Sequence, residues 1–264
     1  MSACLSGHLR PNYLCHRFRI VLCGIALTYG GFAQAQPTAP VSPRAKDFPE
    51  EIAKSFAALF STANLRPLVF GSLATGVAII PEQNVETYFR DHPEKLESVT
   101  ELGEIMGNEY ILSPIVGGLF VAGRLGGDQR FQSMTYSLTE GFLINGAVTA
   151  SIKYAVGRTR PDGSDNLSFP SGHTSTSFMW ATVLSRTYGP KAGIPAYIAA
   201  SYVGVTRLEE NAHHLTDVVA GTAIGYIVGR TVTRRRRTSR EPRVTWKIAP
   251  TRGGFAASLS FRGP

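Results

Sequence analysis

Apolar residues recur along the chain with a helical period, in blocks that Pro, Gly or polar residues separate. Residues 50–63 place Ile52, Phe56 and Phe60 on one side, a spacing typical of an amphipathic helix. Further helices are expected at 66–80, 94–106, 109–123, 129–156, 173–187, 191–206 and 215–233. The pattern predicts an all-α fold, a bundle of about six or more helices.

The pattern changes near the end of the chain. Val244, Trp246 and Ile248 alternate with polar residues, and alternation resumes toward Leu259 after the sequence T-R-G-G. Alternation on both sides of a Gly-rich turn predicts a short C-terminal β-hairpin. An isolated hairpin is marginally stable, so we expect this one to pack on another surface.

Residues 1–35 resemble a secretory signal, with basic residues first, then the apolar run Ile20–Phe32 and an A-x-A site that ends at Ala35. An uncleaved anchor is the alternative, although the apolar run is short for a membrane span. A Pro-rich linker is expected at 36–49, a helical domain at 50–233, and a basic tail with the hairpin at 234–264.

The net charge of +8 comes from the two ends of the chain, because the last 35 residues alone hold ten Lys or Arg and one acid. The basic average is therefore a poor argument for nucleic-acid binding, and we expect no nucleic-acid partner. The three cysteines, Cys4, Cys15 and Cys23, all lie in the expected signal segment. A mature chain would have neither a disulfide framework nor a thiolate metal site, and no cofactor is expected.

Basic, hydroxyl and imidazole residues gather in three separate segments of the second half. The candidates are Lys153 and Arg160 in the first, Ser171, Gly172 and His173 in the second, and Arg207, His213 and Asp217 in the third. Cations that converge on an apolar scaffold need an anion to neutralise them, and Arg grips a tetrahedral oxyanion well. The second segment reads as a helix start, where free backbone N–H groups favour anions.

Two histidines supply the reactive chemistry. His213 and Asp217 are four residues apart, so on a helix they would share a face and the carboxylate would orient the imidazole. An oriented neutral imidazole is a competent nucleophile toward phosphorus, and the second imidazole, His173, can act as general acid. The residues alone leave open which histidine attacks.

The three segments read K-x6-R-P, P-S-G-H and R-x5-H-x3-D in this order. Together they resemble the signature of the type 2 phosphatidic acid phosphatase family, which bacterial acid phosphatases and vanadium haloperoxidases share. Thr206 stands where the family usually has Ser, which keeps a hydroxyl. The short stretch from Pro161 to Pro170 suggests a small lid over the site.

The resemblance implies a helical, metal-free phosphohydrolase. His213 would carry a phosphohistidine intermediate, Asp217 would orient it and His173 would protonate the leaving group. The phosphoryl oxygens would be held by Lys153, Arg160, Ser171, Gly172 and Arg207. The expected partner is a phosphorylated substrate, either a lipid phosphate or a small phosphoester. The alternatives are a vanadium-dependent haloperoxidase and a non-catalytic envelope protein with a vestigial phosphate pocket.

Four segments are apolar enough to suggest membrane spans: 66–80, 109–123, 192–206 and 215–232. Each is shorter than the ~20 residues that a span normally needs. If the first two and 138–152 all crossed, the arginines after 233 would lie outside, against the positive-inside tendency. We therefore expect core helices of an exported domain, periplasmic or associated with the envelope membrane. Contact with a membrane surface, or one early segment that does not span, stays open.

Overall fold

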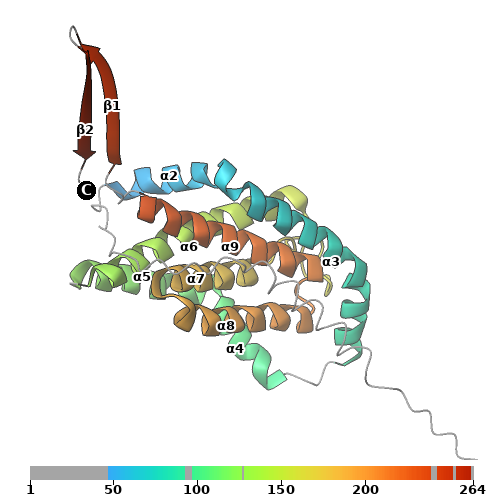
Figure 1. Ribbon diagram of the computed structural model, residues 1–264. Helices are drawn as coiled ribbons and strands as arrows, with labels where there is room; N and C mark the ends of the chain where they lie inside the picture. Colours follow the sequence, from blue (N-terminus) through green and yellow to red (C-terminus); the bar gives the residue numbers. More distant parts are fainter. Residues whose placement is uncertain (1–46, 93–96, 127, 239–242, 252–253, 263–264) are drawn as a thin grey trace, which may run out of the picture. The chain divides into compact units, whose positions relative to one another are not determined.

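The computed structural model describes residues 47–92, 97–126, 128–238, 243–251 and 254–262 (Figure 1). Eight α-helices and the 3-10 turn η2 account for most of these residues. Their bounds are α2 Phe48–Ala58, η2 Thr62–Asn64, α3 Leu65–Asp91, α4 Glu97–Gly107, α5 Glu109–Leu125, α6 Gln129–Val156, α7 Gly172–Tyr188, α8 Pro190–Glu209 and α9 Leu215–Thr238. The predicted all-α bundle is confirmed, while the expected signal segment, 1–35, lies outside the described residues.

The strands β1, Arg243–Thr251, and β2, Gly254–Arg262, pair antiparallel as the sequence predicted. Trp246 pairs with Leu259, and Thr251 pairs with Gly254 at the turn. Arg252 and Gly253 of the expected turn lie outside the described residues. The change from a helical to an alternating pattern therefore marked a real change of structure.

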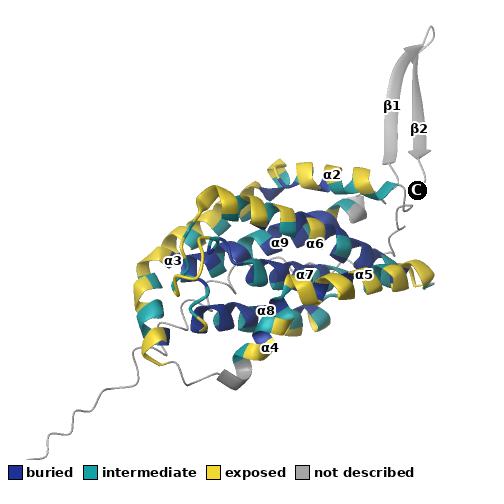
Figure 2. Cartoon of the chain, turned by 180° about the vertical axis from the view of Figure 1, so that it is seen from behind, coloured by how far each residue is buried: buried dark blue, intermediate teal, exposed yellow. Residues whose placement is uncertain are grey.

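Helices α7 and α9 lie side by side through the middle of the bundle (Figures 1 and 2). They approach closely because Gly221, Gly225 and Gly229 form a stripe along the α9 face that meets α7. A Cβ atom at Gly225 would lie 2.1 Å from the backbone oxygen of Ser175. The main core joins these helices to α6 and consists of Leu59, Met134, Leu138, Ile144, Met179, Val183, Ile227, Val228 and Val232.

Helix α6 links this core to the first motif. Its N-cap Asp128 accepts a hydrogen bond from Arg130 N at 2.8 Å, and its buried Asn145 donates to Ser175 Oγ of α7 at 2.9 Å. The helix ends at Gly157, whose φ of 61° is the left-handed conformation that glycine adopts without strain. The chain leaves α6 there, one turn after Lys153.

Helix α3 does not end where the sequence suggested. The apolar run 66–80 was expected to close at Pro81, but the helix continues through that proline to Asp91. A proline inside a helix removes one backbone hydrogen bond and costs about 3 kcal/mol. Packing compensates on both sides of it, because Ala78 and Phe89 are buried in one cluster with Leu208 and Leu215.

The expectation that 66–80 is a core helix is wrong. The segment Thr62–Asp91 is long and apolar enough to cross a membrane, and only 11% of its most apolar window is buried (Figure 2). The bent pair Thr100–Gly107 and Glu109–Leu125 passes the same test when taken as one segment. The sequence prediction treated 66–80 as too short to span a membrane, because it ended the helix at Pro81.

The basic run at the end of α9 has at least one internal role. The guanidinium of Arg235 donates to Ser55 Oγ at 3.0 Å and to the backbone oxygen of Glu51 at 3.1 Å, and it pairs with the Glu51 carboxylate at 3.2 Å. Arg235 therefore fastens α2 to α9.

Candidate active site

The first motif lies where the chain leaves α6. The ammonium of Lys153, on the last turn, donates to the backbone oxygen of Leu167. Arg160 follows in the loop, where it donates to Asp165 Oδ1 at 2.8 Å and to the backbone oxygen of Ala212 at 3.1 Å. The last contact joins the first motif to the segment that carries His213.

The second motif starts α7, as expected. Ser171 is the N-cap, fully buried, and its hydroxyl accepts a hydrogen bond from Thr174 N at 3.4 Å. Its own N–H donates to the backbone oxygen of Asp217 at 3.0 Å, which joins the second motif to the third. A Cβ atom at Gly172 would lie 3.9 Å from Lys153 Cε, so the lysine lies beside the start of this helix.

The third motif supplies a buried imidazole and a buried carboxylate. His213 Nδ1 lies 3.6 Å from Asp217 Oδ2, and both side chains are almost wholly buried. The two do not share a helical face as the spacing suggested, because α9 begins at Leu215 and His213 precedes it. Asp217 is instead the third residue of α9, and its carboxylate accepts from the N–H of His214 at 2.9 Å.

Arg207 lies in the last turn of α8, which ends at Glu209, and its side chain is 3% exposed. The motif position before it, Thr206, is also buried, and its hydroxyl donates to the backbone oxygen of Val203 at 2.8 Å. The hydroxyl that the family usually has here is therefore retained, and it anchors the last turn of the helix that carries Arg207.

The electrostatics of the site favour uncharged imidazoles. Burial, with smaller contributions from Lys153 and Arg160, lowers the pKa of His213, and Asp217 opposes that shift. Burial and the nearby Arg207 lower the pKa of His173 to about 4, and the charge of His213 contributes to the same shift. The two imidazoles thus lie within electrostatic range of each other.

The arginines of the site pair with carboxylates, whereas the ammonium of Lys153 contacts a backbone oxygen. Burial and Arg160 together lower the pKa of Lys153 to about 8. Although burial disfavours its charged form, the nearby imidazole of His213, hydrogen bonds from Ser168 and from the N–H of His214, and the charge of Arg158 keep the pKa of Asp217 below its usual value. An ionised Asp217 beside a neutral His213 is the arrangement that orients an imidazole for attack.

Sequence reasoning missed Glu104, which α4 brings to the site. Its carboxylate contacts Arg207 Nη1 and lies 3.2 Å from His173 Nε2, while Asn108 donates to its other oxygen at 2.8 Å. Gly107 lets α4 approach, since a Cβ atom there would lie 2.7 Å from the His173 ring. The acidic stretch before Gly107 gave no signal of this contact because it belongs to none of the three motifs.

Sequence reasoning also gave no role to Arg158 or Ser168, and both bond to Asp217. Arg158 Nη1 donates to Asp217 Oδ1 at 2.8 Å, and the hydroxyl of the buried Ser168 donates to Oδ2. The only hint in the sequence was that Arg158 occupies one of the variable positions of K-x6-R-P.

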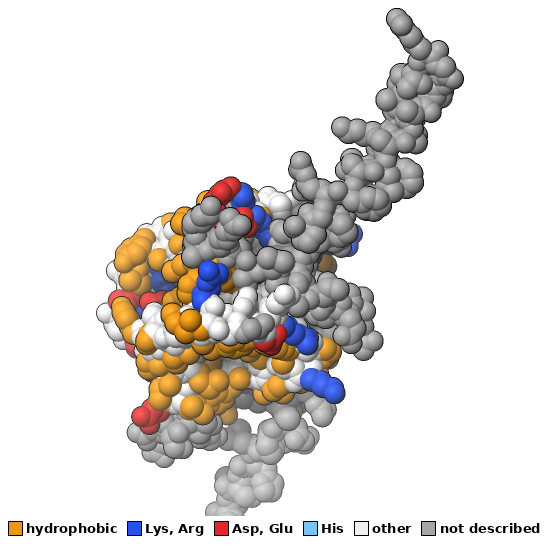
Figure 3. Space-filling view, turned by 90° about the vertical axis from the view of Figure 1, so that its left-hand side faces the viewer, with side chains coloured by type: hydrophobic (Ala, Val, Ile, Leu, Met, Phe, Trp, Pro, Cys, Tyr) orange, Lys and Arg blue, Asp and Glu red, His pale blue; other side chains and the backbone are white. Residues whose placement is uncertain are grey.

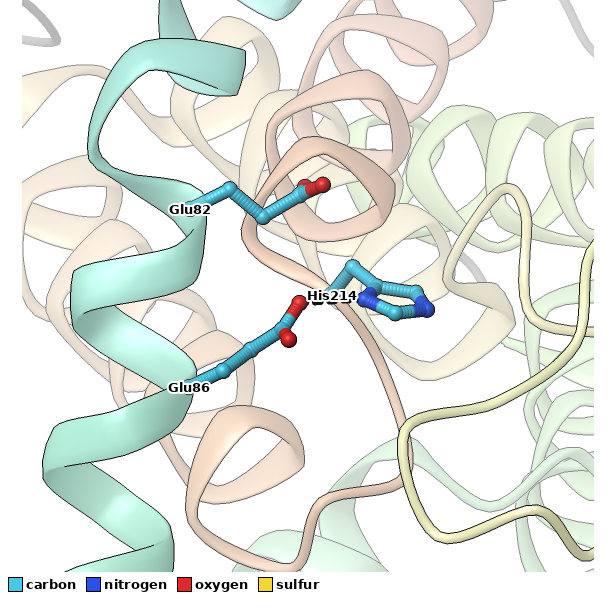
Figure 4. A group of neighbouring side chains, drawn as sticks. All are labelled: Glu82, Glu86 and His214. Atoms are coloured by element: carbon cyan, nitrogen blue, oxygen red, sulfur yellow. Dashed lines mark hydrogen bonds and ion pairs between the residues drawn. The ribbon is translucent and has the colours of Figure 1, made fainter.

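A separate group of possible metal ligands lies next to the third motif. Three possible ligand atoms lie within 4.8 Å of one another, one each from Glu82, Glu86 and His214 (Figure 4). Glu82 already accepts hydrogen bonds from Arg158 and Thr216, and Glu86 pairs with His214. A neighbouring guanidinium opposes a metal cation, so we assign these carboxylates to the protein's own hydrogen bonds.

The three motif segments meet within one helical bundle. Residues 135–241 match the family described as PAP2 superfamily, and this part of the chain is a PAP2 superfamily domain. The resemblance seen in the motifs is thereby confirmed.

Lipid A 1-phosphatase of Porphyromonas gingivalis is 36% identical over 110 residues, which cover 40% of this chain and 25% of that protein. Lipid phosphate phosphatase 1 of Arabidopsis thaliana is 34% identical, over 33% of this chain and 39% of that protein. The chain thus spans less than half the length of these two relatives. The crystal structure of Aquifex aeolicus LpxE aligns with a TM-score of 0.46 and 20% identity, over 58% of this chain and 94% of that one.

Proposed function

We propose that this protein is a metal-independent phosphatase that hydrolyses phosphomonoesters or pyrophosphates, with phosphorylated lipids as its substrates. The observation that carries the proposal is the joining of three distant motifs. Arg160 bonds to the backbone of Ala212, Ser171 bonds to the backbone of Asp217, and Lys153 lies beside Gly172. The PAP2 superfamily domain covers the same motifs.

His213 is the proposed nucleophile. Its Nδ1 faces Asp217, so Nε2 is the nitrogen that attacks phosphorus. As the N–P bond forms, the bond from phosphorus to the leaving oxygen breaks, and protonated His173 transfers its proton to that oxygen. Neutral His173 then takes a proton from water as the water oxygen attacks phosphorus and the N–P bond breaks, which releases phosphate and regenerates neutral His213 and protonated His173.

The remaining motif residues hold the phosphoryl oxygens in this proposal. Lys153, Arg160 and Arg207 supply positive charge, and the N-terminus of α7 at Ser171 and Gly172 supplies backbone N–H groups. Such preorganised donors stabilise the charge that spreads over the equatorial oxygens of the transferring group.

Two observations support a lipid substrate. The relatives described above are named for lipid A and lipid phosphates. Large apolar side chains are also exposed along α3, namely Leu65, Leu68, Val69, Phe70, Leu73, Val77, Ile79 and Ile80. Figure 3 looks at the side of the protein away from α3, and hydrophobic side chains are exposed among charged ones on that face too. We place the protein at a membrane surface, exported to the periplasm or the envelope.

The test compares full-length protein and its His213→Gln variant on lipid phosphates in detergent micelles and on a water-soluble phosphomonoester. We expect phosphate release on the lipid to fall by a factor on the order of 10⁴ in the variant, since a nucleophile is lost. His92→Gln is the control, because this exposed ring stacks on Tyr88. Acid-labile phosphate on the quenched wild-type protein would report the phosphohistidine.

EDTA should leave the wild-type rate unchanged. Turnover retained by His213→Gln would refute the proposed mechanism. Halide oxidation that requires vanadate, without phosphate release, would instead identify a haloperoxidase.

A further inference from the structure

Helix α3 reaches the catalytic segment through its polar end. Glu82 and Glu86, one turn apart on α3, both point toward the segment that leads into α9 (Figure 4). Glu82 Oε2 accepts from the backbone N–H of Thr216 at 2.9 Å and from its hydroxyl at 2.5 Å. Glu86 instead contacts the ring of His214. Two similar carboxylates on one helix therefore have different partners.

Arg158 connects Glu82 to the catalytic carboxylate. Its Nη2 lies 2.7 Å from Glu82 Oε1, and its Nη1 lies 2.8 Å from Asp217 Oδ1 and 2.5 Å from Thr216 Oγ1. The planar guanidinium thus bridges two carboxylates on different helices, a geometry that a lysine ammonium cannot reproduce. Glu82 is the only contact among these that comes from outside the three motif segments.

The two carboxylate oxygens of Asp217 have different partners. Oδ1 is occupied by Arg158, whereas Oδ2 accepts from Ser168 and from the N–H of His214 and lies toward His213. Asp217 is fully buried, so a free arginine would be strongly attracted to it. Without Glu82, Arg158 could turn to bind both oxygens of Asp217 and compete with His213 for Oδ2.

We propose that Glu82, acting through Arg158, is a positioning residue for Asp217 and His213, so that α3 forms part of the catalytic machinery. This inference rests on the proposed phosphatase function. It also assigns a second role to the helix with the exposed apolar face. The helix that would contact lipid holds the carboxylate that keeps the nucleophile aligned.

Glu82→Gln tests the inference, with Glu86→Gln as the matched control on the same helix. Because Gln cannot hold the guanidinium by charge, we expect kcat to fall by about 10- to 100-fold in Glu82→Gln, with KM within about twofold. Glu86→Gln should stay within about twofold of wild type in both constants. Arg158→Lys should lose as much kcat as Glu82→Gln, since a lysine keeps the positive charge but cannot donate to two carboxylates at once as the guanidinium does.

A double-mutant cycle separates positioning from simple destabilisation. Glu82→Gln combined with Arg158→Lys should lose little more kcat than either single variant, because both act through the same bridge. Equal losses in the Glu82 and Glu86 variants, or losses that multiply in the double variant, would overturn the inference. So would a Glu82→Gln variant with wild-type kcat.

A histidine titration followed by NMR keeps this test independent of turnover. Removal of the Glu82 charge makes the surroundings of His213 more positive, so its pKa should fall further in Glu82→Gln and stay unchanged in Glu86→Gln. Lys153, Arg160 and Asp217 also act on His213, while Arg158 acts on Asp217, and all four are retained. If wild type releases no phosphate from any phosphoester, the proposed function fails. An unchanged His213 titration in Glu82→Gln would contradict the positioning role itself.

Discussion

Replacement of Glu104 by Gln should weaken His173 as a proton donor. The carboxylate lies 3.2 Å from His173 Nε2, and a protonated imidazole gains from that neighbour. The Glu104 side chain is 42% exposed, so a water-like dielectric is the appropriate choice, and Coulomb's law then gives about 1.3 kcal/mol. That energy corresponds to a change of about tenfold in the proton affinity of His173. The neutral amide therefore takes the pKa of His173 further below its value of about 4.

The assay is kcat/KM between about pH 3 and about pH 8, because this constant reports the protonation states of the free enzyme. Above its pKa, the protonated fraction of His173 falls in proportion to the proton concentration. Glu104→Gln should therefore show kcat/KM about tenfold lower than wild type from about pH 5 upward, and this difference should shrink to about twofold at about pH 3. Ionisation of the substrate is common to both proteins and cancels in the ratio.

Glu101→Gln is the control, since Glu101 is an exposed residue on the same helix. Superimposable profiles for wild type and Glu104→Gln would refute the role of this carboxylate. A uniform loss that persists at the acid end would show that Glu104 acts on substrate binding rather than on the proton of His173.

Two further predictions concern the phosphate site and the packing. The pKa of Lys153 is about 8, so competitive inhibition by inorganic phosphate should weaken as pH rises above that value. In Lys153→Arg the inhibition should no longer weaken in this pH range, because a guanidinium stays charged. Gly225→Ala should lower the free energy of unfolding by about 1–3 kcal/mol, because the new methyl group would meet the backbone of Ser175. The control Gly146→Ala should not destabilise the protein, because the space around Gly146 is open. Thermal unfolding in detergent compares the last two variants, and equal melting temperatures would contradict the packing argument.

Local sequence rules predicted the helices well wherever packing agreed with them. The bounds of α6 were predicted to the residue, because Asp128 caps its start and Gly157 ends it in the left-handed conformation. The same rules failed at Pro81, where contacts made by distant residues outweigh the local cost of a proline in a helix.

The site could be predicted only as far as the motifs extend. Spacing within a segment identified His213 and Asp217, but it suggested a shared helical face, whereas the structure pairs them across the start of α9. Glu82 and Glu104 are separated from their partners, Arg158 and Arg207, by 76 and 103 positions. Periodicity within a window carries no information about such pairs, because they depend on how helices pack.

The carboxylates of the site fall into two groups by exposure. Three contact the arginines proposed to bind phosphate and are at least 30% exposed: Asp165 on Arg160, and Glu104 and Glu210 on Arg207. Exposed carboxylates can return to water at little cost, so we expect phosphoryl oxygens to replace them on these arginines. Glu82 and Asp217 are 15% and 0% exposed. Breaking a buried pair costs several kcal/mol, so these two should stay on Arg158 throughout the reaction, as a positioning role requires.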